Sequence, residues 1–344
     1  MTRGVDLISN ALKAEGVDTV FTIAGDHTLP LMDHMHGEKF RFVDTRHEQG
    51  AVDMANAWGR TSETPGVTMF TTPGHANAIP GLTLASHMES PLVNIVGSAS
   101  QDRLGQGASQ EIDQVGMASP VTKGSWLISD PYRIPEFIAR AFRTALTGRR
   151  GPVHLTIPLD VQEAKIDPSL VQLFPSKGSR PRGFQQADPS VIEEAIELLR
   201  NSKRPVIIAG NGGFSTRPND LQRLVEITGI PLFTEEFSRG LVPDSHPLCF
   251  GLADGRVNEA AAYVRAADAV LLLGKKIDFM INFGDPPTFS PECKFVQVEP
   301  SVDLIGLSRG VDVAVQGDVG AVVNQLSSEA EKHGWSEHPM VQDL

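Results

Sequence analysis

Three short polar segments in the first half of the chain carry residue types that can do chemistry. Glu48 lies in RHEQG (46–50), His27 lies in AGDHT (24–28), and TPGHAN (72–77) combines a proline, a glycine and an asparagine. A carboxylate can hold or transfer a proton, and the near-neutral pKa of histidine also suits proton transfer. A turn containing Pro and Gly lets backbone approach a ligand closely. These segments are therefore the first candidates for an active site.

Each of these features also has an ordinary structural explanation. Glu48 begins a stretch with helical spacing, and a carboxylate at a helix N-terminus commonly acts as a cap worth ~0.3–1 kcal/mol. A single loop histidine such as His27 is usually solvated, and a glycine-containing turn after a strand is common. Arg46 and His47, beside Glu48, form no metal-binding pattern. Considered one by one, the segments leave both explanations open.

The three segments follow a regular series of predicted strands. Apolar runs bounded by turn residues alternate with stretches long enough for a helix, which is typical of a parallel sheet covered on both faces. The predicted strands of the first half are residues 17–25, 41–45, 66–74, 91–98 and 151–160. Ligands of such sheets bind beyond the carboxyl ends of the strands. We therefore expect the site to be formed by the loops at residues 24–28, 46–50, 72–77 and 97–113.

A second α/β series follows a segment of linker composition. Residues 173–190 are rich in Pro, Gly, Ser and charge and lack periodicity. The elements predicted after it are helices at 190–202 and 219–229, strands at 204–213 and 294–300, a helix and a strand within 260–275, and a last helix capped by Asp318. We predict an α/β fold of two doubly wound domains with mainly parallel sheets, the second of them Rossmann-like. The expected bounds are residues 1–168 and 189–328 for the domains, 169–188 for a linker and 329–344 for a tail.

Composition limits the possible partners. The chain has 344 residues and a formal net charge of −12, which argues against nucleic acid and anionic membranes because phosphate-rich surfaces are bound by clustered Lys and Arg. No apolar stretch approaches the ~18 residues that a membrane span needs, and the N-terminus has no signal-peptide core. Two cysteines without nearby histidine pairs suit a reduced compartment and make no zinc site. We expect a cytoplasmic protein.

Taken together, the segments of the first half resemble the pyrimidine-binding domain of thiamine diphosphate enzymes of the acetolactate synthase group. The second half is similar to the central domain of oxalyl-CoA decarboxylases and 2-hydroxyacyl-CoA lyases, and GDHT (25–28) also resembles benzaldehyde lyase. The segments that carry the resemblance are TRHEQGAVDMANAWGR (45–60), TPGHANAIPGLTLASHMESPLVNIVG (72–97), SQEIDQVGMASPVTK (109–123), GRRGPVHLTIPLD (148–160), RGLVPDSHPLCFG (239–251) and residues 275–300. The resemblance covers residues 4–328.

The resemblance implies a cofactor-binding role for several of the candidate residues. Glu48 matches the glutamate that hydrogen-bonds N1′ of the cofactor's aminopyrimidine. A carboxylic acid at that position favours the imino tautomer, whose 4′-nitrogen can take the proton from thiazolium C2. Pro73, Gly74 and Asn77 match the loop that flanks the pyrimidine ring, and Gly25 matches a cofactor-binding position at the end of the first predicted strand.

The resemblance also implies a reaction pocket and a reaction class. His27 and Gln110 match loop positions that line the pocket, where related enzymes place groups that transfer protons and orient the substrate. The implied reaction is cleavage or formation of a C–C bond next to a carbonyl of a small-molecule substrate, which is a 2-oxo acid, a 2-hydroxyacyl-CoA or an aldehyde. No residue of this chain is expected to bind a metal.

One departure from the family decides what the chain can do alone. The family continues with a third domain, in which a G-D-G motif and a later Asn bind magnesium and the diphosphate; here the sequence stops at Leu344, and its Asp-Gly pair, Asp254 and Gly255, lies in the predicted second domain. We therefore expect the pyrimidine-binding subunit of a split lyase, decarboxylase or carboligase, whose separately encoded partner supplies magnesium and the diphosphate half. A non-catalytic regulatory or nucleotide-binding relative, and a truncated full-length enzyme, stay open as alternatives.

Self-association is expected through the first domain. The run AIPGLTLASHM (78–88) is mostly uncharged and carries Ile79, Leu82, Leu84 and Met88. Soluble monomers rarely expose a contiguous apolar patch, and closed two-fold symmetry is the commonest way to bury one. We therefore predict at least a homodimer, with a further surface left for the partner.

Overall fold

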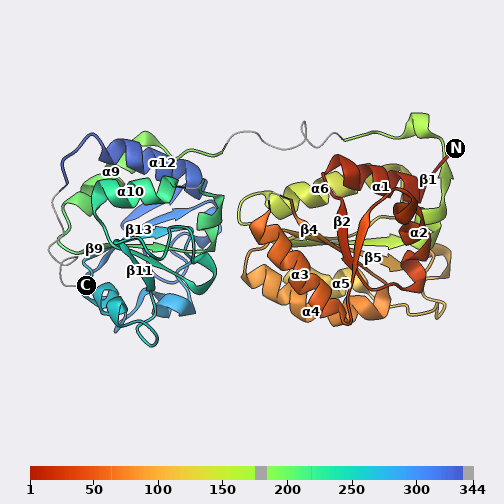
Figure 1. The fold of residues 1–344 in the computed structure, drawn as a ribbon, viewed down its shortest axis with the longest axis horizontal. Coiled ribbons are helices and arrows are strands. Elements are labelled where there is room, and N and C mark those ends of the chain that lie inside the picture. The colour runs from red at the N-terminus through yellow and green to blue at the C-terminus, as the bar shows by residue number, and fades with distance from the viewer. Residues whose placement is uncertain (63, 175–183, 218, 336–344) are drawn as a thin grey trace. The chain divides into compact units, whose positions relative to one another are not determined.

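The chain folds into two compact units, each built on a parallel sheet. The computed structural model describes residues 1–62, 64–174, 184–217 and 219–335, and the units are Met1–Pro181 and Arg182–Leu344. Each unit holds a six-stranded sheet whose strands all pair in parallel (Figure 1). The predicted α/β fold with two doubly wound domains is therefore confirmed. Parts of the predicted linker and tail, residues 175–183 and 336–344, lie outside the described residues.

The sheet of the first unit is built from strands that are buried on both faces at its centre. In spatial order its strands are β3 (Arg41–Asp44), β2 (Thr19–Thr22), β4 (Gly66–Phe70), β5 (Leu92–Ser98), β7 (Pro152–Pro158) and β6 (Ser125–Leu127). Every residue of β4, β5 and β7 is buried, as expected of a parallel sheet with helices on both faces. A separate antiparallel pair joins β1 (Thr2–Arg3) to β8 (Lys165–Ile166).

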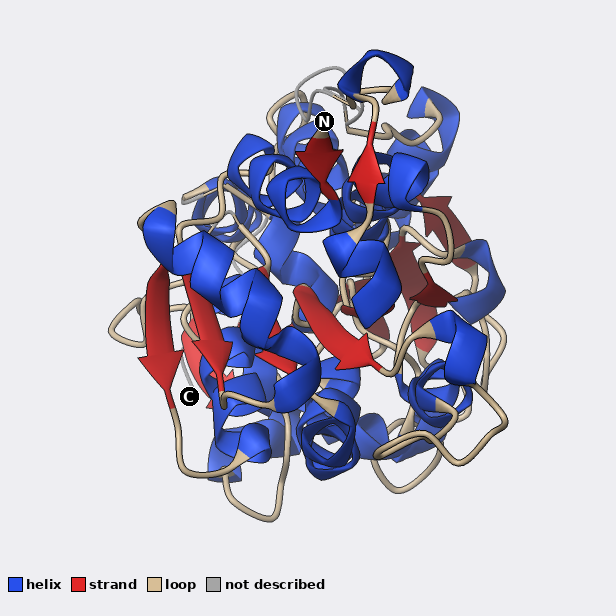
Figure 2. Cartoon of the chain, turned by 90° about the vertical axis from the view of Figure 1, so that its right-hand side faces the viewer, coloured by secondary structure: helices blue, strands red, loops and turns tan. Residues whose placement is uncertain are grey.

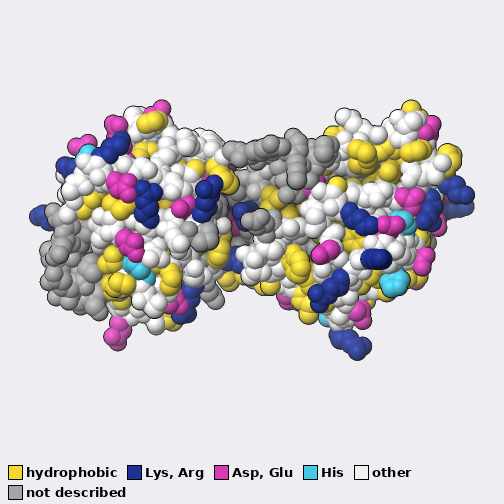
Figure 3. All heavy atoms as spheres, turned by 45° about the horizontal axis from the view of Figure 1, so that its top comes forward, with side chains coloured by type: hydrophobic (Ala, Val, Ile, Leu, Met, Phe, Trp, Pro, Cys, Tyr) yellow, Lys and Arg dark blue, Asp and Glu magenta, His cyan; other side chains and the backbone are white. Residues whose placement is uncertain are grey.

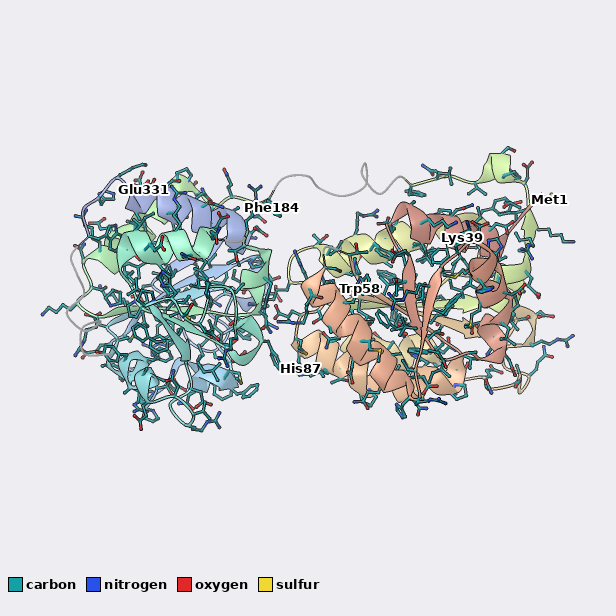
Figure 4. All side chains as sticks on the ribbon, in the orientation of Figure 1. Met1, Lys39, Trp58, His87, Phe184 and Glu331 are labelled. Carbon is teal, nitrogen blue, oxygen red and sulfur yellow. The ribbon has the colours of Figure 1, made fainter. Side chains whose placement is uncertain are left out.

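Helices cover both faces of this sheet (Figure 1, Figure 2). They are α1 (Gly4–Ala14), α2 (Leu29–Gly37), α3 (Glu48–Thr61), α4 (Thr72–His87), α5 (Gln114–Ala118), α6 (Ile134–Leu146) and α7 (Leu159–Glu163). One core joins α1, α2 and α6 to Val67 and Met69 of β4, and the opposite core joins α3 and α4 to Phe70. Trp58 of α3, labelled in Figure 4, meets Phe21 of β2 edge to face at 5.9 Å.

Two sequence expectations for this unit need correction, and one strand was not predicted. The turn predicted at residues 72–77 is the beginning of α4, because Pro73 sits in the first helical turn, where its missing N–H costs nothing. The short strand β6 was not predicted. The apolar patch predicted at 78–88 is smaller than expected, because Leu82 is completely buried in the core with α3, whereas Leu84 remains 41% exposed.

The second unit repeats the architecture with its own core. Its strands, in spatial order, are β11 (Cys249–Leu252), β10 (Leu232–Thr234), β9 (Pro205–Ala209), β12 (Ala269–Leu273), β13 (Lys294–Glu299) and β14 (Val313–Gln316). Its helices are α9 (Pro189–Arg200), α10 (Asp220–Thr228), α11 (Ala262–Ala266) and α12 (Val319–Ala330). The predicted cap of the last helix is confirmed, since the Asp318 carboxylate accepts a hydrogen bond from the Ala321 N–H at 3.1 Å.

The predicted tail is partly folded onto the second unit. Trp335 packs against the core formed by α9, α10 and α12, and its indole N–H donates to the Ala330 carbonyl at 3.0 Å. Partial burial of a large aromatic ring with its polar atom paired holds the described part of this segment in place.

The surface face in Figure 3 shows Lys and Arg interspersed with Asp and Glu. Among the helices of the described ranges, none is both long enough and apolar enough to cross a bilayer.

Candidate active site

Four neighbouring strands bring the predicted loops to one edge of the first sheet. The strands β3, β2, β4 and β5 are adjacent in that order and all parallel, so the segments that follow them emerge on the same side. These segments contain every candidate residue singled out from the sequence. The carboxyl edge of a doubly wound sheet is where ligands of this fold class bind.

Glu48 is the first residue of α3, but it is not the helix cap. The residue before it, His47, has extended backbone and its Nδ1 accepts a hydrogen bond from the Gln49 N–H at 3.2 Å. The side chain of His47 therefore takes the capping role that the position alone suggested for Glu48. The half-buried carboxylate of Glu48 remains near the positive end of the helix dipole, where a negative charge is favoured.

The structure brings Asn77 and Gly74, both in α4, against this carboxylate. The side-chain amide of Asn77 donates a hydrogen bond of 3.0 Å to Glu48 Oε2. Gly74 faces the other oxygen, since a Cβ at this position would lie 2.7 Å from Glu48 Oε1 and 3.1 Å from Cδ. A side chain of any size at Gly74 would therefore displace the carboxylate. One oxygen is oriented by an amide donor and the other lies beside the bare backbone of a glycine.

Pro73 contributes through the start of α4. Thr71 has extended backbone and precedes the helix, with Pro73 in the first turn. The fixed backbone angle of proline favours helix initiation at that point. Pro73 thus helps to set where Gly74 and Asn77 begin to turn toward Glu48.

His27 follows β2 and is buried, in contrast to the solvated loop histidine that its position suggested. Only 4% of its surface is exposed, and its Nδ1 lies 2.8 Å from the Thr71 hydroxyl. Burial lowers the pKa of His27, and the charge of Asp26 opposes this shift. The ring is therefore held neutral more readily than a free histidine.

Thr71 connects His27 to a second candidate residue. Its hydroxyl lies 3.4 Å from the Oε1 atom of Gln110, an exposed residue with a positive φ of 57°. Gly25 makes room for Thr71, because a Cβ at Gly25 would lie 2.3 Å from the Thr71 methyl carbon. His27, Gly25 and Gln110 therefore meet at one threonine.

Sequence reasoning missed Thr71. The available signal was its position, as the polar residue between the buried strand β4 and the helix-initiating Thr72 and Pro73. Its hydroxyl is shared between groups that come from 44 residues before it and 39 residues after it, so the pairing depends on the folded sheet.

The candidate residues of this site do not form a metal centre. Over residues 1–62, 64–174, 184–217 and 219–335, no group of three or more His, Cys, Asp or Glu side chains is arranged to hold a metal ion.

The second unit has a buried ion-pair cluster at the corresponding edge of its sheet. The order of strands changes direction between β9 and β12, where such folds place ligands. Lys275, just after β12, is completely buried and its ammonium lies 2.7 Å from Glu235 Oε1 and 2.6 Å from Asp278 Oδ1. Gly212 approaches Gly274 closely, since a Cβ at Gly212 would lie 2.8 Å from the Gly274 Cα. At this edge of the second sheet, the buried ammonium of Lys275 is therefore paired with carboxylates of the protein itself.

Comparison with known proteins matches both units to one family. Residues 2–117 match the N-terminal TPP-binding domain of thiamine pyrophosphate enzymes, and residues 192–326 match the central domain of the same enzymes; thiamine pyrophosphate is another name for thiamine diphosphate. The matched ranges include Glu48, Gly74 and Asn77 in the first unit.

Similar proteins include enzymes of two kinds. The chain is 34% identical to a probable acetolactate synthase large subunit of Methanocaldococcus jannaschii, over 94% of this chain and 55% of the relative. It is 33% identical to the acetolactate synthase large subunit of Corynebacterium glutamicum, over 97% of this chain and 54% of the relative. It is 30% identical to human 2-hydroxyacyl-CoA lyase 1, over 98% of this chain and 57% of the relative.

The chain spans about half the length of these relatives, and the matches run through both of its units. The two domain matches and the relatives agree with one another. The chain belongs to the thiamine pyrophosphate enzyme family, of which it carries the N-terminal and central domains.

Proposed function

We propose that this chain is the pyrimidine-binding subunit of a thiamine diphosphate-dependent lyase, decarboxylase or carboligase that acts on 2-oxo acids, 2-hydroxyacyl-CoA or aldehydes. The observation that carries the proposal is the Glu48 carboxylate, held by the Asn77 amide at 3.0 Å and faced by Gly74. A half-buried carboxyl group at the carboxyl edge of the sheet suits the edge of an aromatic ring that carries a nitrogen acceptor.

The residues fit the pyrimidine end of the cofactor. Glu48 would hold a proton at Oε1 and share it with a ring nitrogen, while the Asn77 amide keeps Oε2 in place. The missing Cβ at Gly74 would let the carboxyl group keep its place against the backbone of α4 while the ring binds. When bound, the cofactor supplies a nucleophilic carbon that adds to a substrate carbonyl.

His27, with Thr71 and Gln110 beside it, would transfer protons to and from the substrate. If the Thr71 hydroxyl donates to Gln110 Oε1, it can only accept from His27, so the proton of the neutral ring lies on Nδ1. The other ring nitrogen, Nε2, then carries a lone pair and can act as a base. The lowered pKa of His27 favours this neutral form near pH 7.

We propose that magnesium and the diphosphate are bound by a separately encoded polypeptide. The proposal rests on the resemblance to enzymes in which a third domain binds magnesium and the diphosphate, while the chain spans about half the length of its relatives. The homodimer expected through the first domain belongs to the same proposal, with the exposed Leu84 of α4 and Met54 of α3 as candidates for its apolar contact.

Calorimetry and reconstitution test the proposed function. The purified chain, titrated with thiamine diphosphate and magnesium, should bind weakly and show no turnover, whereas a complex with a diphosphate-domain polypeptide from the same genome should bind tightly and turn over. Tight binding by the chain alone would overturn the split arrangement.

The Glu48→Gln variant tests the chemistry in that complex. Glutamine preserves the shape of the side chain but cannot hold the carboxyl proton, so turnover should be lost while the circular dichroism spectrum stays unchanged. Retention of near-full turnover would contradict the assignment of Glu48.

Light scattering coupled to size exclusion tests the proposed homodimer. A ~37 kDa monomer would contradict it.

A further inference from the structure

A buried polar network lies across the centre of the first sheet, beneath the start of α4. Thr68, Asn94 and His154 occupy paired positions on β4, β5 and β7 and are completely buried. The Thr68 hydroxyl donates to Asn94 Oδ1 at 2.8 Å. Polar side chains at such positions are costly unless each is hydrogen-bonded. These three side chains are therefore expected to have hydrogen-bond partners within the first unit.

One member of this row, His154, stacks against a second buried histidine, His75 of α4. His154 of β7 and His75 of α4 have ring centroids 4.4 Å apart and an interplanar angle of 24°. The Asn94 Nδ2 atom lies 3.1 Å from Nδ1 of His75 and also 3.1 Å from Nδ1 of His154. One amide group thus contacts both rings.

A backbone carbonyl fixes the protons at one end of the network. His75 Nε2 lies 3.1 Å from the carbonyl oxygen of Gln114, which can only accept, so Nε2 carries a proton. In the neutral ring Nδ1 then has a lone pair, and Asn94 must present its NH₂ group rather than its oxygen. The second hydrogen of that NH₂ group points to Nδ1 of His154.

The second ring continues the same order of donors and acceptors. Because Nδ1 of His154 accepts from Asn94, its proton lies on Nε2 and is donated to the Thr156 hydroxyl at 2.8 Å. The Thr156 hydroxyl donates in turn to Gln114 Oε1 at 2.9 Å. Each step therefore has one donor and one acceptor.

A second backbone carbonyl closes the network in the same direction. The Gln114 Nε2 atom donates to the Gly97 carbonyl at 3.1 Å and to the Thr72 hydroxyl at 2.7 Å. The Gly97 carbonyl can only accept, so the Gln114 side chain must turn its NH₂ group toward it and its oxygen toward Thr156. This is the same orientation of the Gln114 amide that follows from the proton on His75 Nε2. The two ends agree, and a fully satisfied buried network of this kind specifies a single arrangement.

We propose that Asn94 is a positioning residue: its amide holds both buried histidines in the Nε2–H tautomer, and the network so completed fixes the first turn of α4, which sets Gly74 and Asn77 against Glu48. Thr72 and His75, the two residues of α4 in the network, flank Pro73 and Gly74 in the sequence. The meaning of this positioning for catalysis rests on the proposed function, but the hydrogen bonds themselves do not.

The protonation behaviour of the rings agrees with this arrangement. Burial lowers the pKa of His75 to about 4 and lowers the pKa of His154 strongly. A second proton on either ring would sit on Nδ1 and face the N–H of Asn94, so two donors would oppose each other. All hydrogen bonds of the network can therefore form only when both histidine rings are neutral.

Nitrogen NMR of histidine-labelled protein tests the tautomers directly. In the wild-type chain at pH 7, both rings should show a protonated Nε2 and an unprotonated Nδ1. A proton on Nδ1 of either ring would overturn the proposal. This measurement needs no substitution, so it stands even if a variant fails to fold.

The Asn94→Asp variant tests the role of the amide. A carboxylate of the same shape offers two acceptors and no donor, so at least one ring should gain a proton on Nδ1 and titrate at a higher pH. The matched control is Asn56→Asp, which makes the same chemical change at a buried asparagine of α3 outside the network. Unchanged tautomers in Asn94→Asp would overturn the proposal.

The side-chain amide signal of Asn77 reports whether the network reaches the site. In asparagine-labelled protein this signal should shift in Glu48→Gln, which alters its acceptor, and also in Asn94→Asp, but not in Asn56→Asp. An Asn77 amide signal whose chemical shift is unchanged in Asn94→Asp would overturn the positioning role. Since no cofactor is added, a failure here is distinct from a failure to use thiamine diphosphate.

Discussion

The side-chain amide of Asn77 donates a 3.0 Å hydrogen bond to the carboxylate of Glu48, 29 residues earlier in the chain. Glu48 opens α3 and Asn77 lies in the second turn of α4, so the bond joins the N-terminal ends of two helices that follow strands of one sheet. It fixes one carboxylate oxygen and directs the other toward Gly74. Several measurable consequences depend on this pair and on the groups that surround it.

Gly74→Ala should weaken binding of thiamine diphosphate to the reconstituted complex by about tenfold or more, which corresponds to about 1.4 kcal/mol. The new Cβ would lie 2.7 Å from Glu48 Oε1, so the carboxylate must move. Gly37→Ala at the end of α2 is the control, because a Cβ there meets nothing within 4 Å. Equal cofactor affinity of the two variants would show that the space beside Glu48 is not used.

Thr71→Val should lower turnover by about tenfold to a hundredfold, less than the ~10²–10⁴-fold that general acid–base catalysis contributes, because His27 is misplaced rather than removed; cofactor affinity should stay unchanged. Valine keeps the shape but loses the hydroxyl that lies 2.8 Å from His27 Nδ1. Thr71→Ser keeps the hydroxyl and should restore turnover. Steady-state kinetics on the reconstituted complex measure both; a valine variant as active as the wild type would remove His27 from the proton-transfer path.

The stability of the first domain should fall as the pH drops from 6.5 toward 4. The folded-state pKa of His75 is lowered to about 4 from 6.5, so in this window the unfolded chain binds a proton that the folded chain does not. The stabilisation is fully present above pH 6.5, and about 3 kcal/mol is lost by pH 4 from this residue alone. His154, whose pKa is also lowered, adds to the loss.

Urea denaturation at several pH values checks this dependence. Fluorescence of Trp58 and Trp126 follows the first domain when Trp335 of the second unit is replaced by Phe. His75→Gln should show a shallower dependence on pH between 6.5 and 4 than the wild type. Identical slopes for the two proteins would mean that His75 is protonated in the folded state.

Arg149→Met should destabilise the first domain by about 1.5–3 kcal/mol, the range for a hydrogen bond to a charged group, because it removes the guanidinium that contacts a buried carboxylate. The Arg149 guanidinium lies 2.5 Å from Glu89 Oε1, and the two side chains are only 9% and 6% exposed. Arg223→Met is the matched control, since its pair with Glu331 is 44% and 50% exposed and should contribute about 0–1 kcal/mol. Thermal unfolding measures both; equal losses would show that burial does not strengthen the Glu89 pair.

The amino-acid sequence by itself determined the fold and the location of the site. Apolar runs bounded by Gly and Pro, spaced by helix-length stretches, are sufficient to predict parallel sheets, because side-chain periodicity and turn residues are local properties. The carboxyl ends of those strands then place Glu48, His27 and the segment 72–77 at one edge. The resemblance of the motifs added the proposal that Glu48 pairs with a pyrimidine ring.

Only the tertiary structure decided which local explanation applied to each residue. His47 rather than Glu48 caps α3, and His27 is buried against Thr71 rather than solvated. Caps and burial depend on backbone angles and on neighbours from other strands, which no window of sequence contains.

The buried network shows the same limit most clearly. In sequence, Asn94 and His154 are isolated polar residues within apolar runs, and nothing nearby indicates a partner. Asn94 meets Thr68 and His154 across 26 and 60 residues, because the registers of β4, β5 and β7 align them. Hydrogen-bond direction is a property of the closed set of donors and acceptors, so it is defined only when the strands have paired.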